Sequence, residues 1–214
     1  MYRDPIVVGA DLSLTDTGLF SIDLETREIN FASIKTKPKD FNYPNERKRY
    51  IADSIKDFLD KVTNNGELCY KVVYEGYAFN KFGGESSNLT DLAELKGVVM
   101  DIIGDGITVT TQQVKKIATD HGKITQALLK KLTGTLYKGT YALGKAKKQL
   151  VIDGVKKRFN FETKNDNIAD ACSLAHIGVS IYGDKDMLGS YGIGSKAQLE
   201  VVKAVRKKFK QEIS

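Results

Sequence analysis

Short apolar runs alternate with longer amphipathic stretches along this chain, and their order predicts an α/β fold. Five segments carry the apolar or alternating pattern of β-strands, and they span residues 6–11, 19–22, 27–35, 68–74 and 107–109. Short turns separate the first three segments, which predicts an antiparallel meander. The fourth is strongly apolar and contains β-branched residues, which predicts a buried strand parallel to the first.

Apolar residues recur at helical spacing between and after these strands. The predicted helices span residues 45–62, 88–103, 126–132, 145–159, 166–182 and 195–213, with a basic helical stretch from residue 112. Asn165 is a good N-cap for the helix that begins at Asp166. The glycine-rich segment 133–145 is expected to form a loop or hairpin, and 183–194 a flexible connector. This order matches a ribonuclease H-like mixed five-stranded sheet flanked by helices, with a C-terminal helical extension.

The composition describes a soluble globular protein. Hydrophobic residues make up 41% of the 214 positions and charged residues 28%, and no apolar run reaches membrane-spanning length. No signal peptide opens the chain, and two cysteines, Cys69 and Cys172, cannot form a disulfide framework. We therefore expect a cytoplasmic protein with no membrane partner, in which both cysteines are reduced core residues.

Positive charge is concentrated in one part of the chain. The net charge is +6, yet residues 115–164 alone hold 13 Lys and Arg side chains against Asp120, Asp153 and Glu162. A basic half on an otherwise balanced protein favours a polyanionic partner. Lysine-rich helices that are simply solvated are the alternative explanation of this pattern.

Acidic side chains end two of the predicted strands and recur on one helix. Asp11 ends the first strand, Glu75 ends the fourth, and Asp166 and Asp170 share a helix face with Asn167 alongside. If the two strands are parallel neighbours, their acids meet at one edge of the sheet. Clustered carboxylates repel one another unless they share a cation, and all-oxygen ligands suit Mg²⁺ or Mn²⁺. Two such ions hydrolyse phosphodiesters in known enzymes.

Each acid also has an ordinary structural explanation when it is taken singly. Asp11 is suited to capping a turn, Glu75 to a surface turn, and Asp166 to the positive end of a helix dipole. Asp170 has the weakest such explanation, because its neighbours in the helix are apolar. The sequence contains no catalytic Ser/His/Asp arrangement, zinc motif or phosphate-binding loop that offers a competing chemistry.

Four motifs resemble the RuvC-type Holliday-junction resolvases, especially their phage relatives. The motifs are Gly9-Ala10-Asp11-Leu12-Ser13 with Thr17-Gly18, Tyr74-Glu75 with Leu95-Lys96-Gly97-Val98-Val99, Gln113-Val114-Lys115-Lys116 with Gly122, and Asp166-Asn167-Ile168-Ala169-Asp170-Ala171. They occur in family order and span about residues 6 to 180. The resemblance implies a nuclease domain over residues 1–183, followed by a connector and a basic C-terminal helix over 184–214.

The resemblance also implies a homodimer that nicks four-way DNA junctions symmetrically, in recombination and repair, in a bacterial or phage-infected cell. It implies Mg²⁺, or Mn²⁺, with two ions per active site and no small-molecule cofactor. Metal-binding acids are expected at Asp11, Glu75 and Asp170. The family usually has Asp or His three residues before the last acid, where this chain has Asn167. The fourth ligand is therefore either Asp166 or the carbonyl oxygen of the Asn167 side chain.

DNA contacts are implied at two places. Family members insert an aromatic residue of the loop after the glutamate into the junction, and the loop here holds Tyr77, Phe79, Lys81 and Phe82, of which we favour Phe79. Basic residues follow at Lys115, with a catalytic role, and Lys116. A second family lysine aligns with Gln126, which leaves Lys123 as its substitute.

The main hypothesis is thus a metal-dependent, structure-selective DNA endonuclease that resolves branched DNA. A catalytically inactive module of the same fold that binds branched DNA is one alternative. A nuclease of broader specificity that acts on forks or flaps is another.

Overall fold

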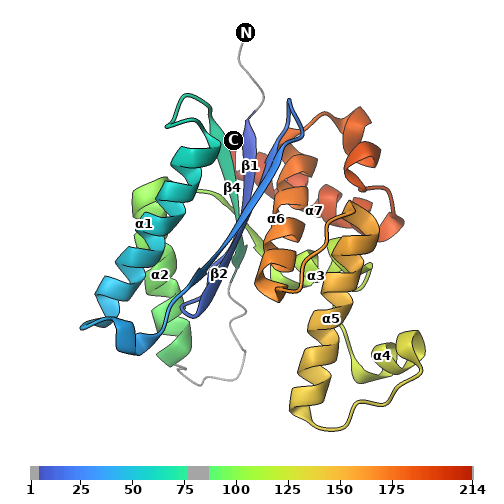
Figure 1. The fold of residues 1–214 in the computed structure, drawn as a ribbon. Coiled ribbons are helices and arrows are strands. Elements are labelled where there is room, and N and C mark those ends of the chain that lie inside the picture. The colour runs from blue at the N-terminus through green and yellow to red at the C-terminus, as the bar shows by residue number, and fades with distance from the viewer. Residues whose placement is uncertain (1–4, 77–86, 214) are drawn as a thin grey trace.

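The chain folds around a five-stranded mixed sheet, seen in a computed structural model that describes residues 5–76 and 87–213 (Figure 1). The strands are β1 (Ile6–Asp11), β2 (Asp16–Asp23), β3 (Ile29–Lys35), β4 (Tyr70–Gly76) and β5 (Ile107–Thr110). Their order is β3-β2-β1-β4-β5. The pairs β1–β2 and β2–β3 are antiparallel, and the pairs β1–β4 and β4–β5 are parallel. The predicted meander and the predicted parallel pairing are both confirmed.

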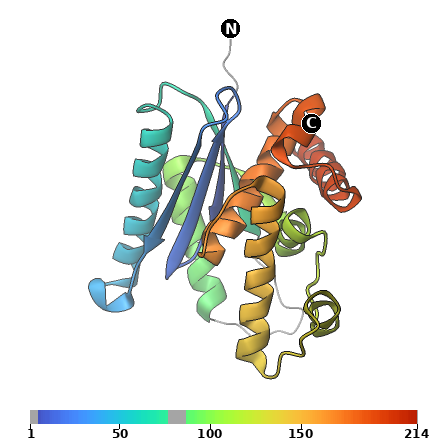
Figure 2. The ribbon, with the colours of Figure 1, turned by 45° about the vertical axis from the view of Figure 1, so that its right-hand side comes forward.

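Helices cover both faces of this sheet, as the sequence predicted (Figures 1 and 2). They are α1 (Pro44–Val62), α2 (Ser87–Ile103), α3 (Thr111–Thr119), α4 (Gln126–Thr133), α5 (Thr140–Phe159), α6 (Asp166–Tyr182) and α7 (Lys196–Ile213), with 3-10 helices η1 (Pro38–Asp40) and η2 (Lys185–Tyr191). α1 and α2 cover one face. On the other face α6 packs against β1 and β2, flanked by α3 and α5, and α7 packs outside α3 and α6.

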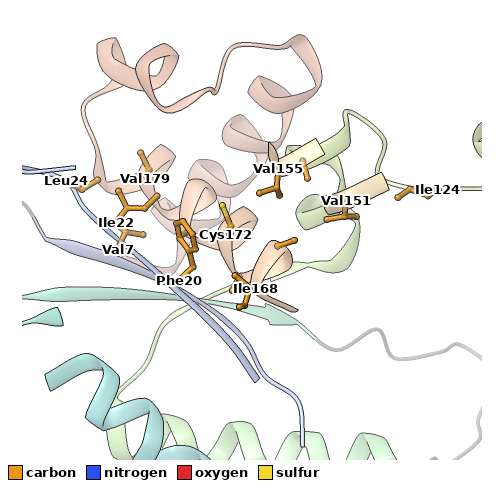
Figure 3. Packing of buried hydrophobic residues seen from close by; sticks show 14 of the residues in the cluster. Val7, Phe20, Ile22, Leu24, Ile124, Val151, Val155, Ile168, Cys172 and Val179 are labelled. Carbon is orange, nitrogen blue, oxygen red and sulfur yellow. The ribbon is translucent and has the colours of Figure 1, made fainter. Parts of the chain in front are cut away.

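The alternation of side chains along β1 divides the buried core into two halves. Val7 faces α6 and packs in one cluster with Phe20 of β2 (Figure 3), whereas Ile6 and Val8 face α1 and α2. Because both faces of the strand are covered, its sequence is a continuous apolar run. Asp11 lies four residues after Val7, so the same alternation places it on the α6 side of the sheet.

Helix α6 lies against β1 and β2 at backbone distance, because glycines occupy the contact. A Cβ atom at Gly9 would lie 2.0 Å from the carbonyl oxygen of Ala171, and one at Gly18 would lie 2.2 Å from that of Asn167. No larger residue fits at either position without moving the helix. The contact fixes how far the N-terminal turns of α6, which carry Asp170, lie from the end of β1.

The segment between α4 and α5 differs from its prediction. α5 begins at Thr140 and not at Lys145, so the predicted loop or hairpin over 133–145 is wrong for its second half. Gly139, at φ +83°, is the N-cap of the helix, and Gly144 lies within the helix with open space around its Cα. The glycines suggested irregular backbone, but an exposed helix tolerates one at a modest cost of about 1 kcal/mol.

Two smaller predictions also meet a different structure. Cys172 is buried as expected, but Cys69 is exposed, because β4 begins only at the next residue and leaves Cys69 outside the core. The segment expected as a flexible connector contains η2, and its Leu188 and Ile193 are buried against Val202 of α7. Within the described ranges, every helix is too short or too polar to cross a membrane.

Candidate active site

The parallel pairing of β1 and β4 brings the first two acids to one edge of the sheet. Ala10 pairs with Tyr74, so Asp11 and Glu75 follow at the same level of neighbouring strands. The hydroxyl of Thr111, the first residue of α3, donates a hydrogen bond of 2.5 Å to Oε1 of Glu75. This bond orients the carboxylate and ties the end of β4 to the start of α3.

The N-terminus of α6 is anchored to β2 and β3, the strands that lie beyond β1 from β4. As predicted, the side chain of Asn165 caps the helix and accepts hydrogen bonds from the backbone N–H groups of Asn167 (2.8 Å) and Ile168 (3.3 Å). Its amide nitrogen donates to Asp16 of β2 (3.1 Å) and to Ser33 of β3 (3.3 Å). The cap therefore fixes both where α6 begins and where it lies on the sheet.

Asp170 lies on α6 with one carboxylate oxygen sealed from solvent. Within residues 5–76 and 87–213, its Oδ1 is the buried side-chain atom that has no hydrogen-bond partner. Burial raises the pKa of Asp170 to about 7, and the charges of Glu75 and Asp166 act in the same direction. Lys115 and Lys148 oppose them. Burying an ionised carboxylate without a partner costs free energy. A proton or a bound cation at this oxygen would lower that cost.

The remaining acids belong to the same electrostatic group. Burial raises the pKa of Asp11 well above its ordinary value, and the charges of Asp170, Glu75 and Asp166 add to the effect. The pKa of Glu75 is raised too, mainly by burial, against the hydrogen bond from Thr111. We call Asp11, Glu75, Asp166 and Asp170 the acid cluster. The charges of Glu75, Asp166 and Asp170 therefore all act on Asp11, so the four carboxylates that the sequence singled out influence one another.

The acid cluster has the oxygen donors of a divalent-cation site, but its side chains are not close enough to one another to form one. Its donors are carboxylate oxygens, which Mg²⁺ and Mn²⁺ prefer, and its mutual repulsion and the unpartnered oxygen of Asp170 favour an added positive charge. In the part of the chain that the structure describes, however, no three His, Cys, Asp or Glu side chains converge closely enough to enclose a metal ion. The donor set therefore suits a divalent cation, although the described side chains do not by themselves enclose one.

Two lysines border the acid cluster, and sequence reasoning found only one of them. Lys115 of α3 acts on Glu75 and Asp170, as its place in the motif suggested. Lys148 of α5 forms an ion pair with Asp166, with Nζ 2.5 Å from Oδ2. Nothing in the spacing of the lysine-rich segment distinguishes Lys148 from its neighbours, because the fold of α5 onto α6 decides which lysine arrives at the cluster.

Two other lysines that we expected near the DNA have described surroundings that do not include the acid cluster. Lys116 donates a 2.6 Å hydrogen bond to Glu200 of α7. Lys123 is exposed and, with Lys116 and Asp120, lines a depression at the junction with α7. Gln126, which occupies the position of the second family lysine, donates its amide to the backbone carbonyl of Tyr137.

The remaining site predictions concern Asn167 and the loop after β4. Asn167 contributes its backbone carbonyl to the tight contact with Gly18. The aromatic and basic loop residues lie outside the described residues, namely Tyr77, Phe79, Lys81 and Phe82.

Comparison with known proteins identifies the fold. No model of a known protein family matches this sequence, and no curated protein matches it. A structure of RuvC from Thermus thermophilus matches over 79% of this chain and 90% of its own, at 17% sequence identity and a TM-score of 0.52. This chain has a RuvC-like fold. A second structure, T. thermophilus RuvC in complex with a Holliday junction substrate, matches 84% of this chain and 96% of its own at 14% identity and a TM-score of 0.52.

The order of strands and helices predicted a mixed five-stranded sheet flanked by helices, and the resemblance of the four motifs predicted a RuvC-type fold; both are confirmed. At these identities the likeness concerns the fold alone, and the chemistry has to be argued from this chain's own residues. The acid cluster lies where the parallel strands β1 and β4 end, which is the edge at which open α/β sheets hold their sites.

Proposed function

We propose that this chain is a metal-dependent, structure-selective DNA endonuclease that resolves four-way junctions by paired nicking. One observation carries the proposal: on a RuvC-like fold, four carboxylates from β1, β4 and α6 form one electrostatic group that contains a buried, unpartnered oxygen. Such a group is costly to maintain unless a cation uses it. An inactive module that only binds DNA has no physical reason to keep it.

The chain's own residues divide into ligands and orienting groups. Asp11, Glu75 and Asp170 would supply oxygen ligands to Mg²⁺ or Mn²⁺, with Asp166 or Asn167 as the fourth. Thr111 holds the Glu75 carboxylate in place. The chemistry that bound divalent ions would supply here is activation of a water molecule and stabilisation of the leaving oxygen of a phosphodiester. Lys115 adds positive charge next to Glu75 and Asp170, where a phosphate would enter.

A basic projection next to the site supports a DNA substrate. α4 and the N-terminal half of α5 extend past the sheet at the end where β1 and β4 terminate (Figure 1). Residues 121–152, which include this projection, hold seven lysines and no Asp or Glu. Tyr141, 86% exposed, and Leu136, 52% exposed, lie among them. Lysines interleaved with exposed aromatic and apolar side chains are typical of surfaces that bind nucleic acid.

A four-way junction is two-fold symmetric, so paired nicking calls for a symmetric dimer with one acid cluster for each cut strand. One of the RuvC structures of the same fold is a complex with a Holliday junction substrate. The proposal assigns this chain the same class of substrate and a homodimeric assembly.

The test is a cleavage assay with the full chain and four labelled substrates. A four-way junction, a replication fork, a flap and a linear duplex are incubated in Mg²⁺ or in Mn²⁺, with EDTA as the control. We expect paired symmetric nicks in the junction and none in EDTA. Cleavage of forks or flaps at the same rate would point to a nuclease of broader specificity. Tight junction binding without cutting in either metal would overturn the enzyme proposal and favour the DNA-binding module.

A further inference from the structure

Lys148 reaches the acid cluster from α5, outside the sheet. Its Nζ lies 2.5 Å from Oδ2 of Asp166, and its charge also acts on Asp170 and Asp11. The ammonium group therefore already supplies part of the positive charge that would offset these carboxylates.

We propose that Lys148 is a displaceable counter-cation of the acid cluster, which holds Asp166 while no divalent cation is bound and leaves it when one binds. The inference rests on the proposed function, because it takes the cluster to be a metal site. It assigns Asp166 two alternating partners and makes the lysine a competitor of the metal.

The exposure of the pair shows why Lys148 can leave. Its side chain is 62% exposed and that of Asp166 is 29% exposed, so most of the lysine already lies in solvent. Exposed ion pairs contribute little net stability. The ammonium group of a lysine is strongly hydrated, and its flexible four-carbon stem lets it move into solvent. Lys48 provides the contrast: it is 4% exposed and held by both Asp91 and Glu94 across the interface of α1 and α2. Lys48 is a fixed structural cation, whereas Lys148 is not.

Electrostatics gives the direction of the effect. An ammonium group on Asp166 repels an incoming dication and withholds one of its oxygen ligands. Removing the positive charge of Lys148 should therefore strengthen metal binding, although it removes a favourable ion pair from the metal-free chain. A lysine that only joins α5 to α6 would lower the melting temperature when it is replaced and leave the metal affinity unchanged.

The experiment is a Mn²⁺ titration of the full chain without DNA, followed by electron paramagnetic resonance of the free ion. We expect Lys148→Met to bind Mn²⁺ roughly 2- to 5-fold more tightly than the wild type, the range that an exposed ion pair allows. Lys148→Arg keeps the charge and should bind like the wild type. Lys156→Met is the matched control, because it removes a comparable exposed pair on the same helix, Lys156 with Glu162 at 2.7 Å.

The outcomes separate the two proposals. A wild-type chain that binds no Mn²⁺ overturns the proposed function, and the role of Lys148 with it. If the wild type binds and Lys148→Met matches Lys156→Met, or binds more weakly, the counter-cation is overturned while the proposed function stands. The counter-cation proposal is also overturned if Lys148→Arg binds Mn²⁺ as tightly as Lys148→Met does. Arginine keeps the positive charge, so loss of that charge could not explain the tighter binding.

Discussion

At the scale of the residue, Asp170 distinguishes this site from an ordinary group of surface acids. The sequence already marks it, because a carboxylate between apolar helix neighbours is hard to explain by solvation. The structure adds what the sequence cannot show, namely that one of its oxygens is both buried and unpartnered. If the chain binds a cation as proposed, that oxygen would link its stability to the binding.

Replacing a ligand carboxylate by its amide keeps the shape and removes the charge. We expect Asp11→Asn and Asp170→Asn to reduce junction cleavage by at least about 100-fold, since even the outer-shell partners of metal ligands are worth 10- to 100-fold. Junction binding, measured by gel shift, should remain largely intact. Asp101→Asn, which changes an exposed acid on α2, is the control and should cut at the wild-type rate. An Asp170→Asn variant as active as this control would contradict the assignment.

The raised pKa of Asp170 predicts how stability changes with pH. Burial first, and then the charge of Glu75, raise the pKa of Asp170 to about 7 in the folded chain, whereas the unfolded chain titrates near the ordinary value of about 4. Between these values the folded state binds more protons, so the free energy of unfolding falls as the pH rises. We expect the metal-free wild type to lose on the order of 1 kcal/mol or more relative to Asp170→Asn between about pH 5 and pH 7. Urea unfolding at each pH measures it, and a constant difference would contradict the account.

At the scale of the element, the contact of α6 with β1 and β2 sets the geometry of the site. We expect Gly9→Ala to destabilise the fold by about 3 kcal/mol or more, because its Cβ would overlap backbone atoms of α6 that no rotamer change can move. Gly97→Ala is the control: Gly97 is exposed on α2 with open space around it, and alanine there should be neutral or stabilising. Thermal unfolding of both variants tests the comparison. Equal melting temperatures would mean that α6 shifts freely on the sheet.

The elements also show what could be predicted from the sequence. The start of α6 was predictable because Asn165 is a local signal, and the parallel pairing of β1 with β4 was predictable from their apolar runs. Local signals failed where tertiary packing decides. The five extra residues of α5 follow a glycine cap that resembles a loop, and Lys148 reaches Asp166 only because α5 packs on α6. The candidate ligands could therefore be predicted, whereas the lysine that pairs with one of them could not.

At the scale of the whole molecule, charge is distributed unevenly around the sheet. α4 and the N-terminal half of α5, whose sequences are rich in lysine, extend past the end of the sheet at which β1 and β4 terminate (Figure 1). The molecule therefore presents negative charge where cations would bind and positive charge next to it, where a DNA backbone would lie. Such an arrangement predicts binding that weakens steeply with salt.

Neutralising two lysines of this projection should lower the salt dependence of junction binding. We expect the double variant Lys130→Gln, Lys131→Gln to reduce the slope of log affinity against log salt by up to about 2, since each phosphate contact contributes about 0.9. Lys37→Gln with Lys39→Gln, at η1 on the other side of the sheet, is the control of equal charge. Fluorescence anisotropy between about 50 and 200 mM salt measures both slopes. If the slope falls equally in the two double variants, the salt dependence of junction binding follows the net charge and not the position of the lysines.

Where α6 meets the sheet, Gly9 and Gly18 let backbone atoms of the helix lie directly against the strands. The spacing of Asp11 and Asp170 therefore depends on covalent geometry more than on the identity of nearby side chains. Large core residues such as Phe20 can be exchanged over evolutionary time, with effects on melting temperature, while the two carboxylates keep their separation. A chain built in this way can change at most of its positions and still keep the placement of these two acids, which is consistent with a shared fold at 17% identity.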